Sequence, residues 1–265
     1  MKRLSGWRRI ANAIWRAPSD PQIYGTLDVD AEALLRFQSR ARAAGGRVTV
    51  THLVGRALAH ALVRVPALNE RLAFARSEPR ATVDVFFITA VKGGDDVSGV
   101  KVVDVPNKPA LAVAEELTRR AGEKRAGRDA DFSKSKAFLD VLPMPVLRVA
   151  TRLAVFAASS LQLDVKPLGL RANPFGSAMI TSVGMLGIEQ GFAPLAWIYD
   201  VPIMLLVGEI RERAVVVDGR VVARPVLPLS ATIDHRYVDG WQLSHAMRAI
   251  KEYLAAPERF EPPVP

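Results

Sequence analysis

The sequence predicts a single α/β domain with a mixed β-sheet and helices packed on one face. Helical and strand-like runs alternate along the first half of the chain, and short strand-like runs dominate the second half. The 265 residues, 49% of them hydrophobic, are ample for one packed core. No internal repeat or shift of composition marks a second domain, so we expect residues 1–265 to form one domain that ends in a loose tail over 261–265.

The composition excludes several classes of protein. The chain has no cysteine, which excludes disulfides, thiolate metal sites and a cysteine nucleophile and is compatible with a cytoplasmic location. The formal net charge of +9 could attract nucleic acid, anionic lipid or a phosphorylated ligand, but an arginine-rich source with a basic surface explains it better. No nucleic-acid-binding motif is visible, so we expect no nucleic-acid partner. The basic N-terminus lacks the apolar core of a secretory signal, and no apolar run reaches the about 18 residues that a membrane-spanning helix needs.

The first half of the chain reads as helices with one strand. The predicted elements are a helix over 5–16 ended by Pro18, a strand over 22–29, a helix capped by Asp30 that runs to Ala44, and a helix over 49–65 closed by Pro66. His52 and His60 lie eight residues apart in the last helix. Paired metal ligands on a helix need a spacing of about three or four, so we expect no metal site.

The remaining elements are mostly strands. We expect strands over 82–91 and 97–105 around a Gly-Gly-Asp-Asp turn, an amphipathic helix over 109–125, and two apolar helical segments within 133–163 around Pro143 and Pro145. Short strands follow over 177–183, 203–211, 213–217, 220–224 and 227–234, with a hairpin turn at Asp218-Gly219. A final amphipathic helix runs from about Asp239 to Ala255.

The best local signal for chemistry is His235, which directly follows an apolar strand and precedes the final helix. An imidazole at such a junction can take a proton near neutral pH. Asp239, four residues later, is close enough to order the loop or to bias the ring, and Gly240 permits a close backbone approach. On spacing alone, a structural role explains this histidine equally well. We expect His245 to be a surface or interface residue.

The wider context of His235 resembles a known family. The stretch from Leu227 to Gly240, which contains Asp-His-Arg-Tyr-Val-Asp-Gly, is similar to the C-terminal signature of the 2-oxo acid dehydrogenase acyltransferases. These E2 components move an acyl group between dihydrolipoamide and coenzyme A, and chloramphenicol acetyltransferase shares their fold and histidine chemistry. Three upstream blocks, 65–72, 176–187 and 201–208, resemble the same family.

This resemblance implies the coenzyme-A-dependent acyltransferase fold and a mechanism. His235 would act as the general base on a thiol, and Thr181 would donate a hydrogen bond to the tetrahedral oxyanion. Ser182 is the near alternative and a candidate contact of coenzyme A, while Asp239 would support the loop. Coenzyme A or acyl-CoA would be a substrate, and the two site residues would meet across a subunit interface of a trimer. An ordinary strand threonine remains the other explanation of Thr181.

The chain also departs from the family. It contains no lipoyl or peripheral-subunit-binding domain and no covalently bound lipoyl group, so a lipoyl-bearing protein would act in trans, with E1- or E3-type dehydrogenase subunits as further partners. Residues 83–94 differ from the family's channel-lining strand, which leaves the acceptor open. The alternatives are acylation of a free small molecule or lipid, and a non-catalytic oligomeric scaffold.

Residues 133–175 form the largest departure, because an apolar helical insertion replaces a short charged loop. The sequence leaves three interpretations open. The insertion could add core or interface packing, or it could close as a lid over an apolar acyl pocket. The third interpretation is contact with a membrane surface through residues 141–165, helped by the net charge of +9.

Overall fold

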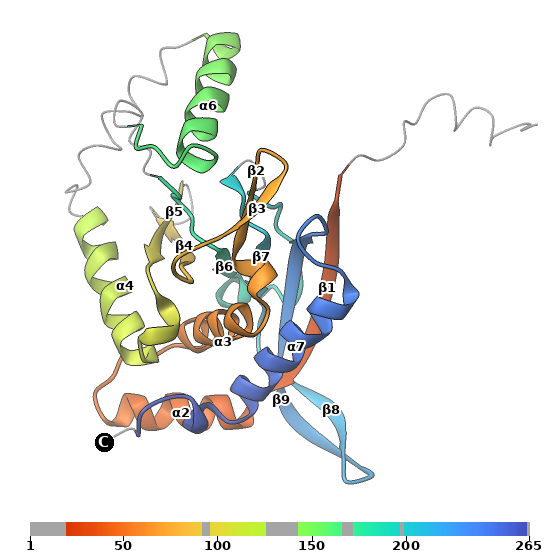
Figure 1. Cartoon of the computed structure of the whole chain (residues 1–265). Helices are drawn as coiled ribbons and strands as arrows, with labels where there is room; N and C mark the ends of the chain where they lie inside the picture. The colour runs from red at the N-terminus through yellow and green to blue at the C-terminus, as the bar shows by residue number, and fades with distance from the viewer. Residues whose placement is uncertain (1–19, 92–95, 126–142, 166–171, 197–198, 264–265) are drawn as a thin grey trace, which may run out of the picture.

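The computed structural model describes residues 20–91, 96–125, 143–165, 172–196 and 199–263 (Figure 1). The predicted helix over 5–16 and the first apolar segment of 133–163 lie outside these ranges. The main sheet has seven strands in the order β1-β9-β7-β6-β4-β5, with β8 pairing β9. Its strands are β1 (Gln22–Asp30), β4 (Val85–Val91), β5 (Asp96–Val102), β6 (Ala178–Ser182), β7 (Ile203–Val207), β8 (Arg211–Val217) and β9 (Arg220–Asp234).

The sheet is mixed, as predicted. Strands β4, β6 and β7 run parallel to one another, and the other pairings are antiparallel. The sheet has two edges that are formed by strand ends. The carboxyl ends of β6 and β7 lie at one of them, and the carboxyl end of β9 lies at the opposite one. This arrangement decides where the candidate site residues can meet.

The helices pack on one face of the sheet, which confirms the predicted fold class (Figure 1). They are α2 (Glu32–Ala43), α3 (Val50–Arg64), α4 (Ala110–Arg125) and α7 (Gly240–Ala255). Helix α3 contributes fully buried Leu53, Leu58 and Leu62 to the core. At Gly55 a Cβ would lie 2.4 Å from the Phe87 ring, so glycine lets α3 approach β4 closely.

Among the described residues, coil segments cover the second face of the sheet. Leu195 and Val201, from the segment between β6 and β7, pack on Met179 and Met204 in a small separate core. A coil cover of this kind carries no apolar periodicity, so the sequence pattern showed only the strands on either side of it.

Several predicted strand boundaries are wrong. Strand β4 begins at Val85 rather than at 82, β5 ends at Val102 rather than at 105, and β8 begins at Arg211 rather than at 213. The runs 220–224 and 227–234 form one continuous strand, β9, although Pro225 lies between them. Pro225 lacks an N–H, but its carbonyl accepts a hydrogen bond from the Ala31 amide at 2.8 Å, so the strand continues through it. Strand β7 ends at Val207 rather than at residue 211. The next residue, Gly208, lies against the Glu189 segment so closely that a Cβ there would be 1.8 Å from the Glu189 carbonyl oxygen.

A hairpin that the sequence did not indicate, β2 (Glu70–Ala73) and β3 (Arg76–Pro79), lies beside helix α6 (Met144–Ser159). Helix α6 begins with a proline in its first turn, as helices often do. It stands apart from the sheet and the other helices (Figure 1). Across the described ranges, no helix is both long and apolar enough to cross a membrane.

The expected loose tail begins later than predicted, because Glu261 is buried. Its carboxylate accepts hydrogen bonds from Arg56 Nε at 2.8 Å and from the Ala110 amide at 2.6 Å, and it also contacts the Tyr253 hydroxyl. A buried arginine needs such a partner, so this glutamate fastens the end of the chain to helices α3 and α4.

Candidate active site

His235 is the first residue after β9, and its ring is held by one short hydrogen bond. Its Nδ1 lies 2.7 Å from the Val238 carbonyl oxygen, and its own amide donates to the Pro21 carbonyl at 2.9 Å. A carbonyl oxygen only accepts, so Nδ1 carries the proton in the neutral ring and Nε2 keeps its lone pair. The residue is exposed, and Nε2 is the ring nitrogen that this tautomer leaves to accept a proton from a substrate.

An internal ion pair fixes the loop that carries His235. The Asp234 carboxylate is buried, and Arg236 donates to both of its oxygens from Nε, at 2.9 and 3.0 Å, and from Nη2 at 2.5 Å. The hydrogen bonds from Arg236 to Asp234 raise the pKa of this arginine. The sequence showed both residues but assigned neither a role, because a pairing two residues apart leaves no periodic signal.

Tyr237 ties the same loop to strand β2. Its hydroxyl accepts a hydrogen bond from the Leu72 amide at 3.3 Å, and burial raises its pKa to about 12. Asp200, from the turn before β7, adds to this rise. The loop around His235 is therefore held by Asp234 inside the sheet and by Tyr237 on the neighbouring hairpin.

Asp239 caps helix α7. Its side chain accepts from the Trp241 amide at 2.8 Å, and Gln242 Oε1 accepts from the Asp239 amide at 3.0 Å. These two bonds form a capping box, in which residues at the start of a helix satisfy each other's free amides. This geometry supports the predicted role in ordering the loop, whereas the ring of His235 is oriented by the Val238 carbonyl and not by this carboxylate.

Thr181 and Ser182 lie at the carboxyl end of β6, where their side chains point to opposite faces of the sheet. Thr181 shares its face with Met179, beneath the coil cover. Ser182 lines a shallow depression of about 200 Å³ together with Val50, Gly184 and Gly208. At Gly184 a Cβ would lie 2.4 Å from the Gly208 carbonyl oxygen, so these two glycines allow the strand ends to close together.

One chain does not bring Thr181 and His235 together. Thr181 pairs with Leu206 of β7, and Leu206 pairs with Ser230 of β9. From Ser230 to His235 is five residues (235 − 230), about 16 Å along the strand, and two strand spacings add about 10 Å across it. The two residues are therefore roughly 19 Å apart within a protomer. Contact within one chain is excluded, and a shared site needs a second copy.

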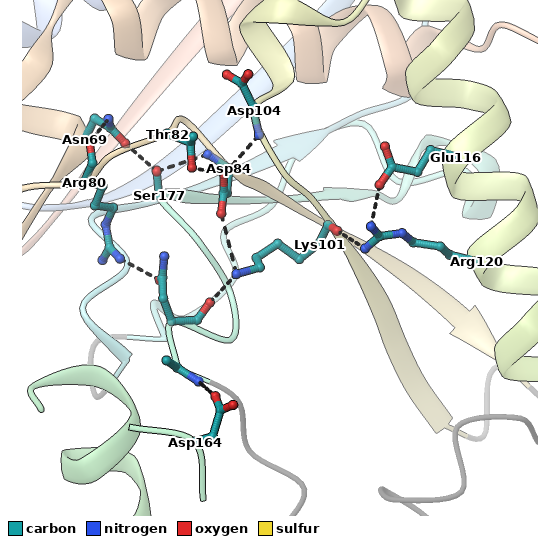
Figure 2. A network of polar contacts seen from close by, with 12 residues as sticks. Asn69, Arg80, Thr82, Asp84, Lys101, Asp104, Glu116, Arg120, Asp164 and Ser177 are labelled. Carbon is teal, nitrogen blue, oxygen red and sulfur yellow. Dashed lines mark hydrogen bonds and ion pairs between the residues drawn. The ribbon is translucent and has the colours of Figure 1, made fainter. Parts of the chain in front are cut away.

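A polar network lies at the amino ends of β4 and β6, which is the same edge of the sheet as His235 (Figure 2). Buried Asp84 accepts from the Thr82 hydroxyl at 2.7 Å and from the Asp104 amide at 3.0 Å, and pairs with Lys101 at 3.5 Å. Ser177, which precedes β6, donates from its hydroxyl to Asn69 at 2.5 Å. The network fixes the entry of the chain into β6.

Arg80 joins this network to the turn before β7. It donates to Asn173 Oδ1 and to the Asp200 carbonyl, both at 2.6 Å. Burial lowers the pKa of Arg80, while nearby Tyr237 and Asp200 raise it. Two residues after Asp200, the Pro202 carbonyl accepts from the Asp234 amide at 2.9 Å. A continuous set of contacts thus runs from Asp84 to the residue before His235.

The part of the chain that holds the candidate site residues is similar to a known protein family. Residues 172–261, which contain Thr181, Ser182, His235 and Asp239, match the family described as 2-oxoacid dehydrogenases acyltransferase (catalytic domain). The predicted resemblance is confirmed. A dihydrolipoyllysine-residue acetyltransferase component of the pyruvate dehydrogenase complex from Bacillus subtilis is 36% identical over 126 residues. That alignment covers 44% of this chain and 27% of the relative, so the chain matches about a quarter of the relative's length.

Solved structures of acyltransferases share the fold over nearly the whole chain. A probable dihydrolipoamide acetyltransferase from Listeria monocytogenes superposes with a TM-score of 0.68 at 20% identity, covering 93% of this chain and 89% of its own. The cubic core of a pyruvate dehydrogenase multienzyme complex gives a TM-score of 0.65 at 20% identity, covering 91% and 84%. The acyltransferase fold therefore extends well beyond residues 172–261.

Proposed function

We propose that this chain is an acyltransferase of the E2 type, which moves an acyl group between coenzyme A and a dihydrolipoamide-type thiol. The observation that carries the proposal is the hydrogen bond from His235 Nδ1 to the Val238 carbonyl, which leaves Nε2 as the ring nitrogen that can accept a proton. We extend the proposal to the whole chain, with residues 1–265 as one catalytic domain in which 133–175 form an insertion.

The chemistry follows from the residues. Nε2 of His235 takes the proton of the incoming thiol, and the thiolate forms a bond to the thioester carbonyl carbon. The carbonyl oxygen becomes an oxyanion and accepts a hydrogen bond from the Thr181 hydroxyl of a neighbouring copy. Collapse of the tetrahedral intermediate breaks the original carbon–sulfur bond, and the leaving thiolate takes the proton from His235. Asp239 and the Asp234–Arg236 pair hold the loop, and Ser182 is the proposed contact of coenzyme A.

A trimer is the proposed functional unit. Its first support is the roughly 19 Å between Thr181 and His235 within one protomer, because one chain cannot supply both groups to one carbonyl. Its second support is the set of exposed apolar side chains at both edges of the sheet. Met185 (83% exposed) and Leu186 follow β6, while Tyr24 and Trp241 (72% exposed) lie near His235. Exposed patches of this kind are typical of subunit interfaces.

The test compares two histidines of the same region. His235→Ala is expected to slow transfer from acetyl-CoA to dihydrolipoamide by about 10²–10⁴-fold, because it removes the general base. His245→Ala is the matched control, since that ring contacts Trp241 on helix α7, and its rate should stay near wild type. An unchanged rate in His235→Ala would contradict the proposal.

The same assay separates the acceptors. Transfer to small free thiols or amines but not to dihydrolipoamide would replace the lipoyl acceptor with a free one and keep His235 as the base. We further propose E1- and E3-type dehydrogenase subunits as partners and a cytoplasmic location. The support for both is the pyruvate dehydrogenase relatives. Co-purification of such subunits with the tagged chain tests the first.

A further inference from the structure

Helix α6 carries an apolar stripe that nothing in the described parts of the chain covers. Val146, Val149, Leu153 and Phe156 repeat at intervals of three and four residues, and between 46% and 64% of each residue is exposed. This spacing places them on one side of the helix. The opposite side, with Ala154, Val155 and Ala158, is buried against the protein. The stripe is therefore a second apolar face, separate from the one that packs.

The tip of the β2–β3 hairpin extends this stripe. Phe74 is 64% exposed, and its ring meets the ring of Phe156 edge to face with centroids 6.1 Å apart. Phe74 and Ala75 have φ angles of +52° and +57°, a left-handed conformation that side chains larger than glycine rarely adopt. A two-residue hairpin turn needs this conformation, but glycine or asparagine usually adopts it, so the exposed phenylalanine at this tip is unusual.

The carboxyl end of α6 is held by hydrogen bonds from strand β2. Arg71 of β2 donates from Nη1 to the Ser160 carbonyl at 2.8 Å and to the Ser159 carbonyl at 3.3 Å, at the end of α6. A cation there satisfies the free carbonyls and complements the helix dipole. The next residue, Leu72, bonds Tyr237 of the His235 loop. The helix is thus fastened beside the candidate active site with its stripe directed outward.

Charge identifies the occupant of this face. Between Val141 and Val165 the sequence has two arginines, Arg148 and Arg152, and one acid, Asp164, which lies beyond the end of α6. Both arginines are exposed beside the stripe, and Arg76 lies on the adjoining hairpin. Two copies of α6 packed together would bring arginine against arginine, with no acid on the helix to pair with them. An anionic bilayer supplies both an apolar phase for the stripe and negative charge for the arginines.

We propose that α6 and Phe74 form a docking face for an anionic lipid surface, with the stripe entering the boundary between headgroups and acyl chains. The inference goes beyond the proposed acyl transfer and does not rest on it. Because Arg71 and Leu72 link α6 to the loop of Tyr237, docking would place the His235 edge beside the bilayer.

The test is sedimentation with vesicles, using the full-length chain. Wild type is expected to pellet with vesicles of phosphatidylcholine and phosphatidylglycerol and to pellet weakly with phosphatidylcholine alone. Val149→Glu should lose this binding by at least about tenfold, since it places a charge in the stripe. Val63→Glu is the matched control, because Val63 is a half-exposed valine on helix α3, and it should pellet like wild type. Equal circular dichroism spectra would show that both variants are folded.

A second variant tests the charge. The double substitution Arg148→Gln and Arg152→Gln should weaken partition into anionic vesicles on the order of 30-fold, with little effect on neutral ones. Wild type that stays in the supernatant with anionic vesicles would overturn the inference, as would Val149→Glu that pellets like wild type. If wild type does not pellet and Val149→Glu instead changes the oligomeric mass, the stripe belongs to a second copy. His235→Ala should bind vesicles normally, which keeps this test separate from that of the acyl transfer.

Discussion

At the scale of single residues, the position of His235 depends on how the loop from Asp234 to Asp239 is held. Four of its side chains have a defined partner: Asp234 has Arg236, His235 Nδ1 has the Val238 carbonyl, Tyr237 has the Leu72 amide and Asp239 has the Trp241 amide. When the base is already oriented, less conformational entropy is lost on going to the transition state, so the activation free energy is lower. The loop therefore prepares His235 before any substrate binds.

The cap at Asp239 makes a prediction about stability. Asp239→Ala should lower the free energy of unfolding by about 1 kcal/mol, because the Trp241 amide loses its acceptor. Asp239→Asn keeps a side-chain oxygen at the same place and should be close to wild type. Urea unfolding of the three proteins measures the difference. Equal losses in both variants would show that the charge of Asp239, rather than its cap, holds the loop.

The sequence was enough to locate His235 and Asp239, because both lie in one short stretch where a strand gives way to a helix. It was not enough to show how far Thr181 lies from them. That distance depends on β7 lying between β6 and β9 and on the register of two strand pairings, neither of which leaves a trace in local spacing. The Arg80–Asp200 contact was unpredictable for the same reason, since it joins residues 120 apart.

At the scale of elements, helix α3 contains a partly buried histidine, His52, that should respond to pH. His52 Nδ1 accepts from the Thr49 amide in a capping box at the start of α3, and burial lowers the pKa of His52 to about 4. In the unfolded chain its pKa is about 6.5, so below that pH the unfolded state binds a proton that the folded state does not. Stability is therefore present above pH 6.5 and is lost as the pH falls toward 4.

The loss from His52 is expected to reach up to about 3 kcal/mol at pH 4. His52→Gln keeps an acceptor for the Thr49 amide but cannot titrate, so its stability should fall less over the same interval. Urea unfolding at a series of pH values gives both curves. The other acidic and basic groups are common to both proteins and cancel in the difference. Parallel curves would show that His52 titrates normally in the folded chain.

The end of the chain offers a second test at this scale. Glu261→Ala leaves Arg56 buried without its carboxylate and should cost about 3–5 kcal/mol in the free energy of unfolding. Glu258→Ala is the matched control, three residues earlier, because its ion pair with Arg40 is exposed and should contribute at most about 1 kcal/mol. Chemical denaturation compares the two variants. A loss of similar size in both would contradict the anchoring role of Glu261.

Element boundaries show where sequence patterns reach their limit. A proline ordinarily breaks a strand, but at Pro225 the strand continues because the position does not need an N–H. The β2–β3 hairpin was missed because its turn uses Phe74 and Ala75, whereas turns of this conformation usually contain glycine or asparagine. Helix α6 buries one side, with Ala154 and Ala158, and exposes the other side, which is the one that we propose for membrane docking.

At the scale of the whole molecule, the sheet separates the two halves of the proposed site. His235 follows the carboxyl end of β9 at one edge, and Thr181 lies near the carboxyl end of β6 at the other. In a ring of identical copies, one edge of each protomer can meet the opposite edge of the next, so each interface completes one site. The central claim is that His235 and Thr181 act on one substrate from neighbouring copies.

Subunit mixing tests this claim most directly. His235→Ala and Thr181→Ala chains, each with a different affinity tag, are unfolded and refolded together, and oligomers that carry both tags are isolated. Separately, each variant should be nearly inactive in transfer from acetyl-CoA to dihydrolipoamide. In a trimer that carries both tags, one interface of the three pairs an intact His235 with an intact Thr181, so the rate should recover to about a third of wild type. Mixed oligomers that remain as inactive as either parent would contradict a site shared between copies.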